Sequence, residues 1–408
     1  MAASRTYDVL IAGAGPAGLA TALFLLRERP ALAGRIAALE KACHPRPKIC
    51  AGGLIPKAVA TLKELGVGLD APAVEVFDGE ARTPVKTINL GRRAEPLCTI
   101  VRRDQFDAGL ARAACRHGLT LHEATSILGV RAEADRICVE TTQGCFYGKV
   151  VVGADGSASR VRRDLFGGLR KDHIGRALMV DLPVDPSATD EFSNQRYRFD
   201  FNCLNNGLSG YSWSFPCLID ERPHLNLGIY QYRDRRFAQR CTPGLFEELR
   251  KAFPVVADRA PTQLALKAFP IRAFDGNDHF ATDRALLVGD AAGVDPLMGE
   301  GISYALEHGR LAAEALRRSL DGDPDAFAQY DDAMRRGAVG VKLRRLGFAA
   351  RRFYGPRHRL YFRLVALSRT AQRLGVDWYN GADGADRMSI AQVVVRWVSG
   401  ALRPGGAS

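Results

Sequence analysis

Val9-Leu10-Ile11-Ala12-Gly13-Ala14-Gly15-Pro16-Ala17-Gly18 is the stretch that decides the fold of this 408-residue chain. Its apolar first half, from about Tyr7 to Ala12, predicts a fully buried parallel strand. A helix is expected from about Pro16 to Arg29, and a second strand over Arg35–Glu40. The chain is therefore expected to begin with a strand–helix–strand unit of a parallel sheet.

The glycine spacing in this stretch predicts a binding site for a dinucleotide. Gly13 permits a tight turn, Gly15 lets the backbone approach a pyrophosphate, and Gly18 lets the helix pack closely on the strand. Pro16 and Ala17 open the helix whose free N–H groups would receive the phosphates. Glu40 ends the next strand and would accept hydrogen bonds from ribose hydroxyls. A glycine-rich turn in some other α/β protein is the competing interpretation.

Two later segments narrow the dinucleotide to FAD. Asp155 follows an apolar strand over Tyr147–Gly153, and Asp290 follows another over Ala285–Val288. An aspartate at such a strand end can accept a hydrogen bond from a ribityl hydroxyl. Gly301 and Ile302 begin a long helix whose backbone N–H groups could face the negative end of a reduced flavin.

The middle of the chain has a different pattern of residues. Alternating apolar and polar residues predict an antiparallel sheet with one solvated face, with strands over Leu178–Leu182, Gln195–Phe201, Tyr211–Phe215 and His224–Tyr232. A further helix is expected over Arg103–His117. The fold class is α/β: a Rossmann-type FAD-binding domain interrupted by a mainly antiparallel substrate domain, plus C-terminal helices. We assign residues 1–75, 101–175 and 281–330 to the first domain, 76–100 and 176–280 to the second, and 331–408 to the helical region.

Over residues 7–330 the chain resembles flavoproteins built like para-hydroxybenzoate hydroxylase. The dinucleotide fingerprint and the motifs around Asp155 and Asp290 occur in the same order and at similar separations. The resemblance implies that Asp290 contacts the ribityl chain and that Arg103 lies near the FAD. The competing interpretation for Arg103 is a surface arginine that caps a helix.

Within that superfamily the sequence looks most like the geranylgeranyl reductases. The segment Lys48–Leu54, with Cys50, Ala51 and Gly53, is similar to a loop that lies against the flavin in those enzymes. The segment from Tyr211 to Pro216 matches their Y-x-W-x-F-P substrate motif. Two features depart from the family: Ala51 replaces a glycine, and the G-x-G expected soon after the proline is missing, Gly228 lying further on.

The aromatic residues of that second motif have a physical interpretation of their own. Tyr211, Trp213 and Phe215 alternate, so on a strand all three would face one side and form a wall for an apolar ligand. An aromatic core between sheet and helices is the alternative. Cys50 is the candidate catalytic residue, although a lone cysteine is commonly a small buried apolar residue.

These features predict an FAD-dependent reductase of carbon–carbon double bonds in an isoprenoid or prenyl-lipid substrate. Because the chain has one dinucleotide fingerprint, the electron donor would be a transiently bound NADPH or NADH, or a reduced ferredoxin. One alternative is a monooxygenase or halogenase, for which Lys86 is the candidate lysine between flavin and substrate. Another is a non-catalytic FAD-binding or membrane-surface scaffold.

The net charge of +12 is concentrated in one C-terminal stretch. Of the 57 Lys and Arg, 12 lie between Arg335 and Val376, where there is no Asp or Glu, and 45 remain against 45 acidic residues elsewhere. Aromatic residues are interleaved with these arginines: Phe348, Phe353, Tyr354, Tyr361 and Phe362. The pattern predicts contact with an anionic membrane surface, with a solvated helix face as the alternative. Nucleic acid is not an expected partner, since no recognised module for it is present.

The remaining composition predicts a cytoplasmic protein that is at most peripheral to a membrane. Nine cysteines without paired spacing favour a reducing compartment. The uncharged run Val9–Leu26 could resemble a membrane span, but its glycines and Pro16 divide it into a strand and a helix. The eight histidines show no spacing that predicts a metal site.

Overall fold

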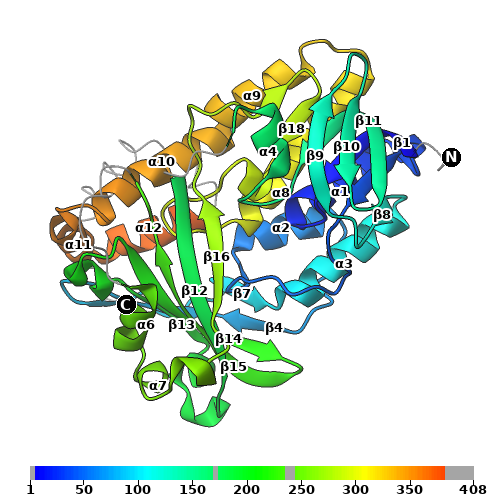
Figure 1. Ribbon diagram of the computed structural model, residues 1–408. Coiled ribbons are helices and arrows are strands. Elements are labelled where there is room, and N and C mark those ends of the chain that lie inside the picture. The colour runs from blue at the N-terminus through cyan, green and yellow to red at the C-terminus, as the bar shows by residue number, and fades with distance from the viewer. Residues whose placement is uncertain (1–4, 169–172, 235–243, 382–408) are drawn as a thin grey trace.

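The computed structural model describes residues 5–168, 173–234 and 244–381. Figure 1 shows two bodies of structure joined by several crossings of the chain: a sheet with a parallel centre and its helices beside the N-terminus, and a large, mainly antiparallel sheet flanked by the C-terminal helices. The expected α/β class, with two sheet regions and C-terminal helices, is confirmed.

The first body is built on an eight-stranded sheet. Its main path runs β17-β18-β11-β1-β2-β8, and β10 and β9 continue from β11. The strands are β1 (Arg5–Ala12), β2 (Ile36–Leu39), β8 (Thr120–His122), β9 (Ile127–Ala132), β10 (Ile137–Thr141), β11 (Gly144–Gly153), β17 (Ala281–Thr282) and β18 (Ala285–Leu287). The central strands β18, β11, β1, β2 and β8 are parallel to one another. The carboxyl-terminal ends of β1 and β11 are buried and apolar, as expected where both faces of a parallel sheet are covered.

Four helices accompany this sheet: α1 (Pro16–Glu28), α3 (Arg103–Arg116), α4 (Arg160–Leu165) and α8 (Ile302–Leu320). α1 is buried from Pro16 to Leu26, because it lies between the sheet and α8. At their crossing, a Cβ added to Gly309 would lie 2.7 Å from the Ala20 Cβ and 2.8 Å from the Thr21 nitrogen. The uncharged run that could resemble a membrane span is thus a buried strand followed by a buried helix.

The second body is a seven-stranded sheet in the order β16-β12-β15-β14-β13-β5-β6. Its strands are β5 (Asp78–Arg82), β6 (Thr87–Asn89), β12 (Ile174–Pro183), β13 (Arg196–Asp200), β14 (Gly210–Ile219), β15 (Arg222–Gln231) and β16 (Lys267–Arg272). One apolar cluster, containing Trp213 and Phe362, lies on the face toward the C-terminal helices. A second cluster, containing Ile229 and Leu249, packs the sheet against α6 (Leu245–Ala252) and α7 (Pro254–Ala257).

The expectation that these strands have one solvated face is wrong for β14. Its first eight residues are all buried, including Ser212 and Ser214. The Ser214 hydroxyl donates to the carboxylate of Glu191 at 2.7 Å, and Glu191 lies on α5 (Asp190–Ser193). The alternation arises because the polar side chains face a covered hydrogen-bonding network rather than water.

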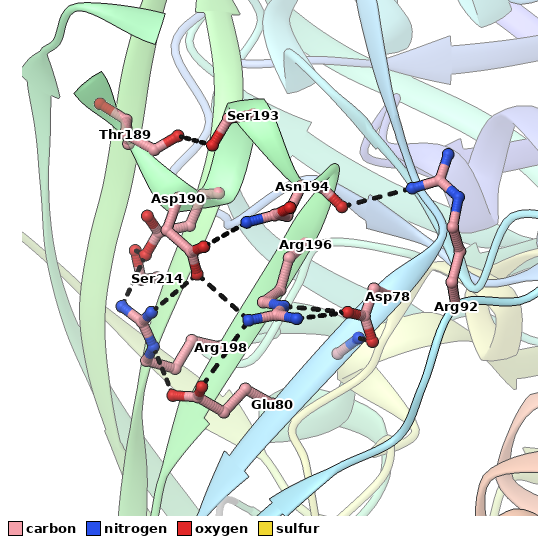
Figure 2. A network of polar contacts seen from close by, with 12 residues as sticks. Asp78, Glu80, Arg92, Thr189, Asp190, Ser193, Asn194, Arg196, Arg198 and Ser214 are labelled. Carbon is pink, nitrogen blue, oxygen red and sulfur yellow. Dashed lines mark hydrogen bonds and ion pairs between the residues drawn. The ribbon is translucent and has the colours of Figure 1, made fainter. Parts of the chain in front are cut away.

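That network joins β13 to β5 through opposite charges (Figure 2). The two strands are parallel, and their register places Arg196 beside Asp78 and Arg198 beside Glu80. Arg196 donates to Asp78 with both Nε and Nη2, and Arg198 Nε lies 2.8 Å from Glu80 Oε1. α5 adds Asp190, whose carboxylate accepts from both arginines. The chain segment that carries β5 is far from β13 in sequence, and these pairs fix its register.

Two further groups of elements complete the fold. A small sheet, β3-β7-β4, consists of β3 (Gly53–Leu54), β4 (Ala73–Val76) and β7 (Cys98–Val101), with α2 (Pro56–Glu64) beside it. The C-terminal helices are α9 (Ala326–Arg336), α10 (Ala338–Phe353), α11 (His358–Ala366) and α12 (Arg369–Asn380). Figure 1 shows α10 leading from the first body to α11 at the far end of the large sheet, with α12 returning beside it. The helical expectation for the last part of the chain holds to residue 381, and residues 382–408 lie outside the described ranges.

Candidate functional site

The loop between β1 and α1 has the geometry of a phosphate-binding turn. Gly13 has a φ of +100°, and a Cβ there would lie 2.5 Å from the carbonyl oxygen of Ala154. A Cβ on Gly18 would lie 2.3 Å from the Gly13 oxygen. At Gly15 an added Cβ would meet only the Arg46 guanidinium, 3.6 Å away. Gly13 and Gly18 therefore hold the turn together, and Gly15 leaves the backbone open toward a cavity.

The start of α1 is available to an anion. Gly15 caps the helix without a side-chain hydrogen bond, and Gly15, Pro16 and Ala17 all line the cavity. Glu40 follows β2, is buried, and also lines the cavity. Its Oε2 accepts from the Ala14 nitrogen at 3.0 Å, which fixes the carboxylate at the end of the strand. This is the position that the sequence predicted for a ribose-binding acid.

The second group of predicted residues lies along the same cavity. Asp155 accepts from the Arg160 nitrogen at 2.6 Å through Oδ2, whereas its buried Oδ1 has no hydrogen-bond partner among the described residues. Burial raises the pKa of this carboxyl. Asp290 Oδ2 accepts from the Ser157 hydroxyl at 3.2 Å, and Gly301 caps α8 without a side-chain hydrogen bond. A buried carboxylate oxygen without a partner fits a ligand rich in hydroxyl groups.

The loop before β3 places Cys50, Ala51 and Gly53 on the cavity wall. Gly52 turns the loop with a φ of +81°, and a Cβ there would lie 2.0 Å from the Val101 oxygen. Its nitrogen donates to the Cys50 sulfur at 3.3 Å. Cys50 is half-buried, as expected for a thiol at the surface of a cavity.

Arg103 lies inside the protein, so its interpretation as a surface arginine is wrong. It is the first residue of α3, lines the cavity and is 7% exposed. Its Nε and Nη2 bind the two oxygens of Asp107 at 2.8 and 3.0 Å. Although burial opposes its charge, the Asp107 carboxylate and the contact with Cys50 raise its pKa. The ion pair keeps a cation beside the thiol loop.

A single cavity of about 890 Å³ connects these groups with the aromatic motif on β14. Tyr211, Trp213 and Phe215 all line it, from one face of the strand. The Tyr211 hydroxyl donates to the Met298 carbonyl, and the indole of Trp213 donates to Asn226 at 2.7 Å. The polar atoms of both rings are thus satisfied, and their apolar surfaces remain toward the cavity.

Gly228 has a role that its distance from Pro216 concealed. The register of β14 and β15 places it directly opposite Trp213. A Cβ on Gly228 would lie 2.1 Å from the Trp213 ring, so only a glycine leaves room for the indole across β15. The glycine is displaced along the sequence from its expected position, yet it adjoins the aromatic motif in the sheet.

Sequence reasoning missed several cavity residues, among them Lys48, Glu300 and Tyr379. Lys48 lies in the quoted loop: its ammonium is 3.2 Å from the centre of the Phe269 ring, and burial lowers its pKa to about 8. Glu300 lies within the Gly299–Ile302 segment, and burial raises its pKa to about 7. Tyr379 on α12 donates to Asp295 at 2.9 Å. The signal for Lys48 and Glu300 was their place inside recognised motifs, whereas nothing in the sequence links Tyr379 to the site.

The C-terminal helices are also part of the cavity wall, which the sequence did not indicate. Phe353, Phe362, Val365 and Val376 line it from α10, α11 and α12. Lys86, the candidate lysine of a halogenase, is exposed on the turn before β6 and is not among the lining residues.

Comparison with known proteins identifies the family behind this geometry. The model of the FAD binding domain family matches residues 6–342. The chain belongs to this family. It is a flavoprotein of the para-hydroxybenzoate hydroxylase type and an FAD-dependent oxidoreductase, which confirms the resemblance stated from the sequence.

Two curated relatives are reductases by name. The chain is 28% identical to the menaquinone reductase of Mycolicibacterium smegmatis over 329 residues, which covers 76% of each protein. It is 27% identical to digeranylgeranylglycerophospholipid reductase 2 of Methanosphaera stadtmanae over 330 residues, covering 78% of this chain and 79% of the relative.

Two solved structures share the fold. A geranylgeranyl bacteriochlorophyll reductase-like protein of Thermoplasma acidophilum superposes with a TM-score of 0.69 at 20% identity, covering 97% of both chains. The flavin-dependent brominase Bmp2 superposes with a TM-score of 0.68 at 18% identity, covering 92% of this chain and 94% of the other. At these identities the likeness establishes the fold and no more.

The described residues fit FAD along the whole wall from Gly13 to Ile302. The open glycine at position 15, the uncapped start of α1 and Glu40 suit the adenosine diphosphate half. Asp290 and the orphaned Asp155 oxygen suit the ribityl–flavin half, and Gly301 and Ile302 line the same cavity. No helix within the described ranges combines the length and apolarity that crossing a bilayer requires.

Proposed function

We propose that this flavoprotein reduces carbon–carbon double bonds of an isoprenoid or prenyl-lipid substrate. The observation that carries the proposal is the cavity, which continues from the FAD-binding loops into an apolar chamber. The chamber is walled by Tyr211, Trp213 and Phe215 on β14 and by Phe362 and Val376 on the C-terminal helices. A long hydrocarbon chain suits such a chamber because it offers no hydrogen bonds and gains from leaving water. A relative named for a geranylgeranyl lipid supports the same substrate class.

The chain's own residues supply binding and a proton. FAD, when bound, supplies the two-electron redox chemistry. The aromatic wall on β14 holds the hydrocarbon and excludes water. Glu300 is a carboxyl group on the cavity wall that can carry a proton near neutral pH, because burial raises its pKa to about 7. We assign Glu300 the role of proton donor to one carbon of the double bond; the other carbon requires a hydride, which comes from the reduced cofactor.

In this proposal Cys50 is the catalytic thiol, on the loop that we expect to lie nearest the flavin ring. Its contact with Arg103 places it beside a fixed cation, and its exposure to the cavity leaves it able to touch a ligand. The electron donor in the proposal is NADPH or NADH bound transiently, or a reduced ferredoxin, since the chain has one dinucleotide fingerprint.

The test is reduction of a double bond by the purified protein. FAD-loaded protein, reduced with dithionite without oxygen, is incubated with a prenyl diphosphate and with a prenylated glycerophospholipid. We expect the product mass to rise by two hydrogens for each bond reduced. Cys50→Ala is expected to lower turnover with FAD content unchanged, whereas Cys138→Ala, at a buried thiol on β10, is the matched control. No mass gain across the panel refutes the reductase proposal.

The brominase neighbour defines the alternative, a monooxygenase or halogenase on the same fold. The exposed position of Lys86 argues against the halogenase version of it. If the reduced protein in air adds oxygen or a halide to an aromatic substrate, and adds no hydrogen to prenyl chains, the alternative replaces our proposal.

A further inference from the structure

Exposed apolar side chains gather on the C-terminal helices. Among the described residues, seven large apolar side chains are exposed, and four of them are Phe348, Leu360, Leu364 and Leu367. The three leucines are spaced so that they share one face of α11 and its C-terminal end. Leu367 is 79% exposed, whereas Phe362 and Ala366 on the opposite face are buried. A helix with apolar residues on both its inner and its outer face is unusual for a surface in contact with water only.

The same surface is cationic. Arg357, Arg363 and Arg369 are exposed, and none of them has a carboxylate partner within the described ranges. The Arg352 guanidinium lies over the ring of Phe348. From Arg335 to Val376 the sequence has no acidic residue that could neutralise them. Leucines flanked by these exposed arginines complement an interface that is apolar inside and anionic at its rim.

α11 separates this surface from the cavity. Phe362 and Val365 line the cavity from the inner side of the helix, and Leu360 and Leu364 are exposed on its outer side. One helix thickness therefore lies between the apolar chamber and the exposed leucines. Figure 1 shows α11 at the outer end of the large sheet, away from the first body of the fold.

We propose that the outer face of α10 and α11 is a docking surface for an anionic lipid bilayer. The three leucines enter the acyl boundary, and the arginines bind lipid phosphates around them. Docking there brings the chamber next to the membrane, so that a lipid substrate passes around α11 without crossing water. The delivery of substrate rests on the proposed function, whereas the docking does not.

The first test is co-sedimentation of the full FAD-loaded chain with vesicles. Phosphatidylcholine vesicles are compared with vesicles that also contain phosphatidylglycerol. We expect binding to the anionic vesicles that weakens as salt is raised. Arg357→Gln/Arg363→Gln/Arg369→Gln is expected to weaken it at least about tenfold, since each arginine contributes separately at such a surface. Leu360→Gln/Leu364→Gln/Leu367→Gln is expected to weaken it similarly, including at low salt.

Matched controls alter the same residue types elsewhere on the surface. Arg112→Gln/Arg116→Gln/Arg163→Gln removes three exposed arginines, and Leu128→Gln removes an exposed leucine from β9. FAD content verifies the fold of each variant. Absence of vesicle binding by the parent chain refutes the proposal, as does an equal loss in the controls. A leucine variant that turns a dimer into a monomer, with vesicle binding intact, shows that a second copy covers this face and likewise refutes it.

Activity on detergent-dispersed substrate separates this proposal from the proposed function. Variants that lose vesicle binding but keep activity in detergent support both. Vesicle binding without any reductase activity leaves the docking standing and refutes the reductase.

Discussion

Glu300 shows how a single residue couples the cavity to the stability of the fold. Its carboxylate accepts from the backbone nitrogen and the hydroxyl of Ser303, at the start of α8. Burial raises its pKa to about 7, and the neighbouring carboxylate of Asp295 adds to the effect. The folded protein therefore binds a proton at Glu300 over a pH range in which the unfolded chain has lost it.

The pH dependence of stability follows from this shift. Stability from Glu300 is fully present below about pH 4.5, the unfolded pKa, and is lost as pH rises through about 7. In flavin-free protein, Glu300→Gln is expected to match the parent at about pH 4 and to be more stable by about 3 kcal/mol at about pH 8. Urea unfolding at both pH values measures the difference. A difference in stability between the two proteins that does not change with pH contradicts the assignment.

At the scale of elements, the pairing of β5 with β13 depends on charge. Arg198 binds Glu80 on one side and Glu191 on the other, with Nε and Nη1 at 2.8 and 2.9 Å from the carboxylates. The Glu191 side chain is 5% exposed, so it has little access to water. The apolar pattern of β13 would allow several partners, whereas two arginines facing two acids allow one register.

Removing one of these arginines should therefore lower the free energy of unfolding more than removing an arginine from a surface ion pair does. Arg198→Met is expected to lower the free energy of unfolding by about 3 kcal/mol, because it leaves the buried Glu191 without its cationic partner among the described residues. Arg136→Met is the matched control: its pair with Glu133 spans 2.7 Å but lies in solvent, so its loss should change the free energy of unfolding far less. Denaturant unfolding of both variants checks this, and equal losses would show that the network adds nothing beyond surface pairing.

At the scale of the whole molecule, the C-terminal helices close the cavity that the two sheets open. Tyr379 on α12 donates to Asp295, and the Lys342 ammonium on α10 donates to the carbonyls of Trp378 and Tyr379. Val376 and Tyr379 line the cavity. The FAD-binding wall comes from other elements, so the two ends of the cavity depend on different parts of the chain.

Removing α12 should weaken binding at the substrate end of the cavity and leave the FAD end unchanged. A chain that ends at residue 367 lacks α12 and is expected to keep its FAD, while the KM for an apolar substrate rises at least about tenfold because one wall of the chamber is gone. A chain that ends at residue 381 keeps α12 and is the control. Flavin absorbance and steady-state kinetics measure both effects. An unchanged KM with intact FAD would show that α12 does not enclose the substrate.

The sequence determined the features that depend on near neighbours in the chain. Gly13, Gly15 and Gly18 lie within one turn, so their spacing alone indicated the phosphate loop. The strand ends before Asp155 and Asp290 were visible as apolar runs that stop at an aspartate. These local patterns predicted the α/β class, the FAD and the family, and the comparisons confirmed all three.

Only the tertiary structure decided which residues from separate parts of the chain face one another. The solvated face expected for β14 is covered by α5, Gly228 meets Trp213 through strand register, and Tyr379 reaches Asp295 from a helix 84 residues further along the chain. Each of these contacts joins segments that are separated in the sequence, and packing selects such partners by shape and charge as the chain folds. The chamber exists for the same reason: its walls come from a sheet and from helices that meet only in three dimensions.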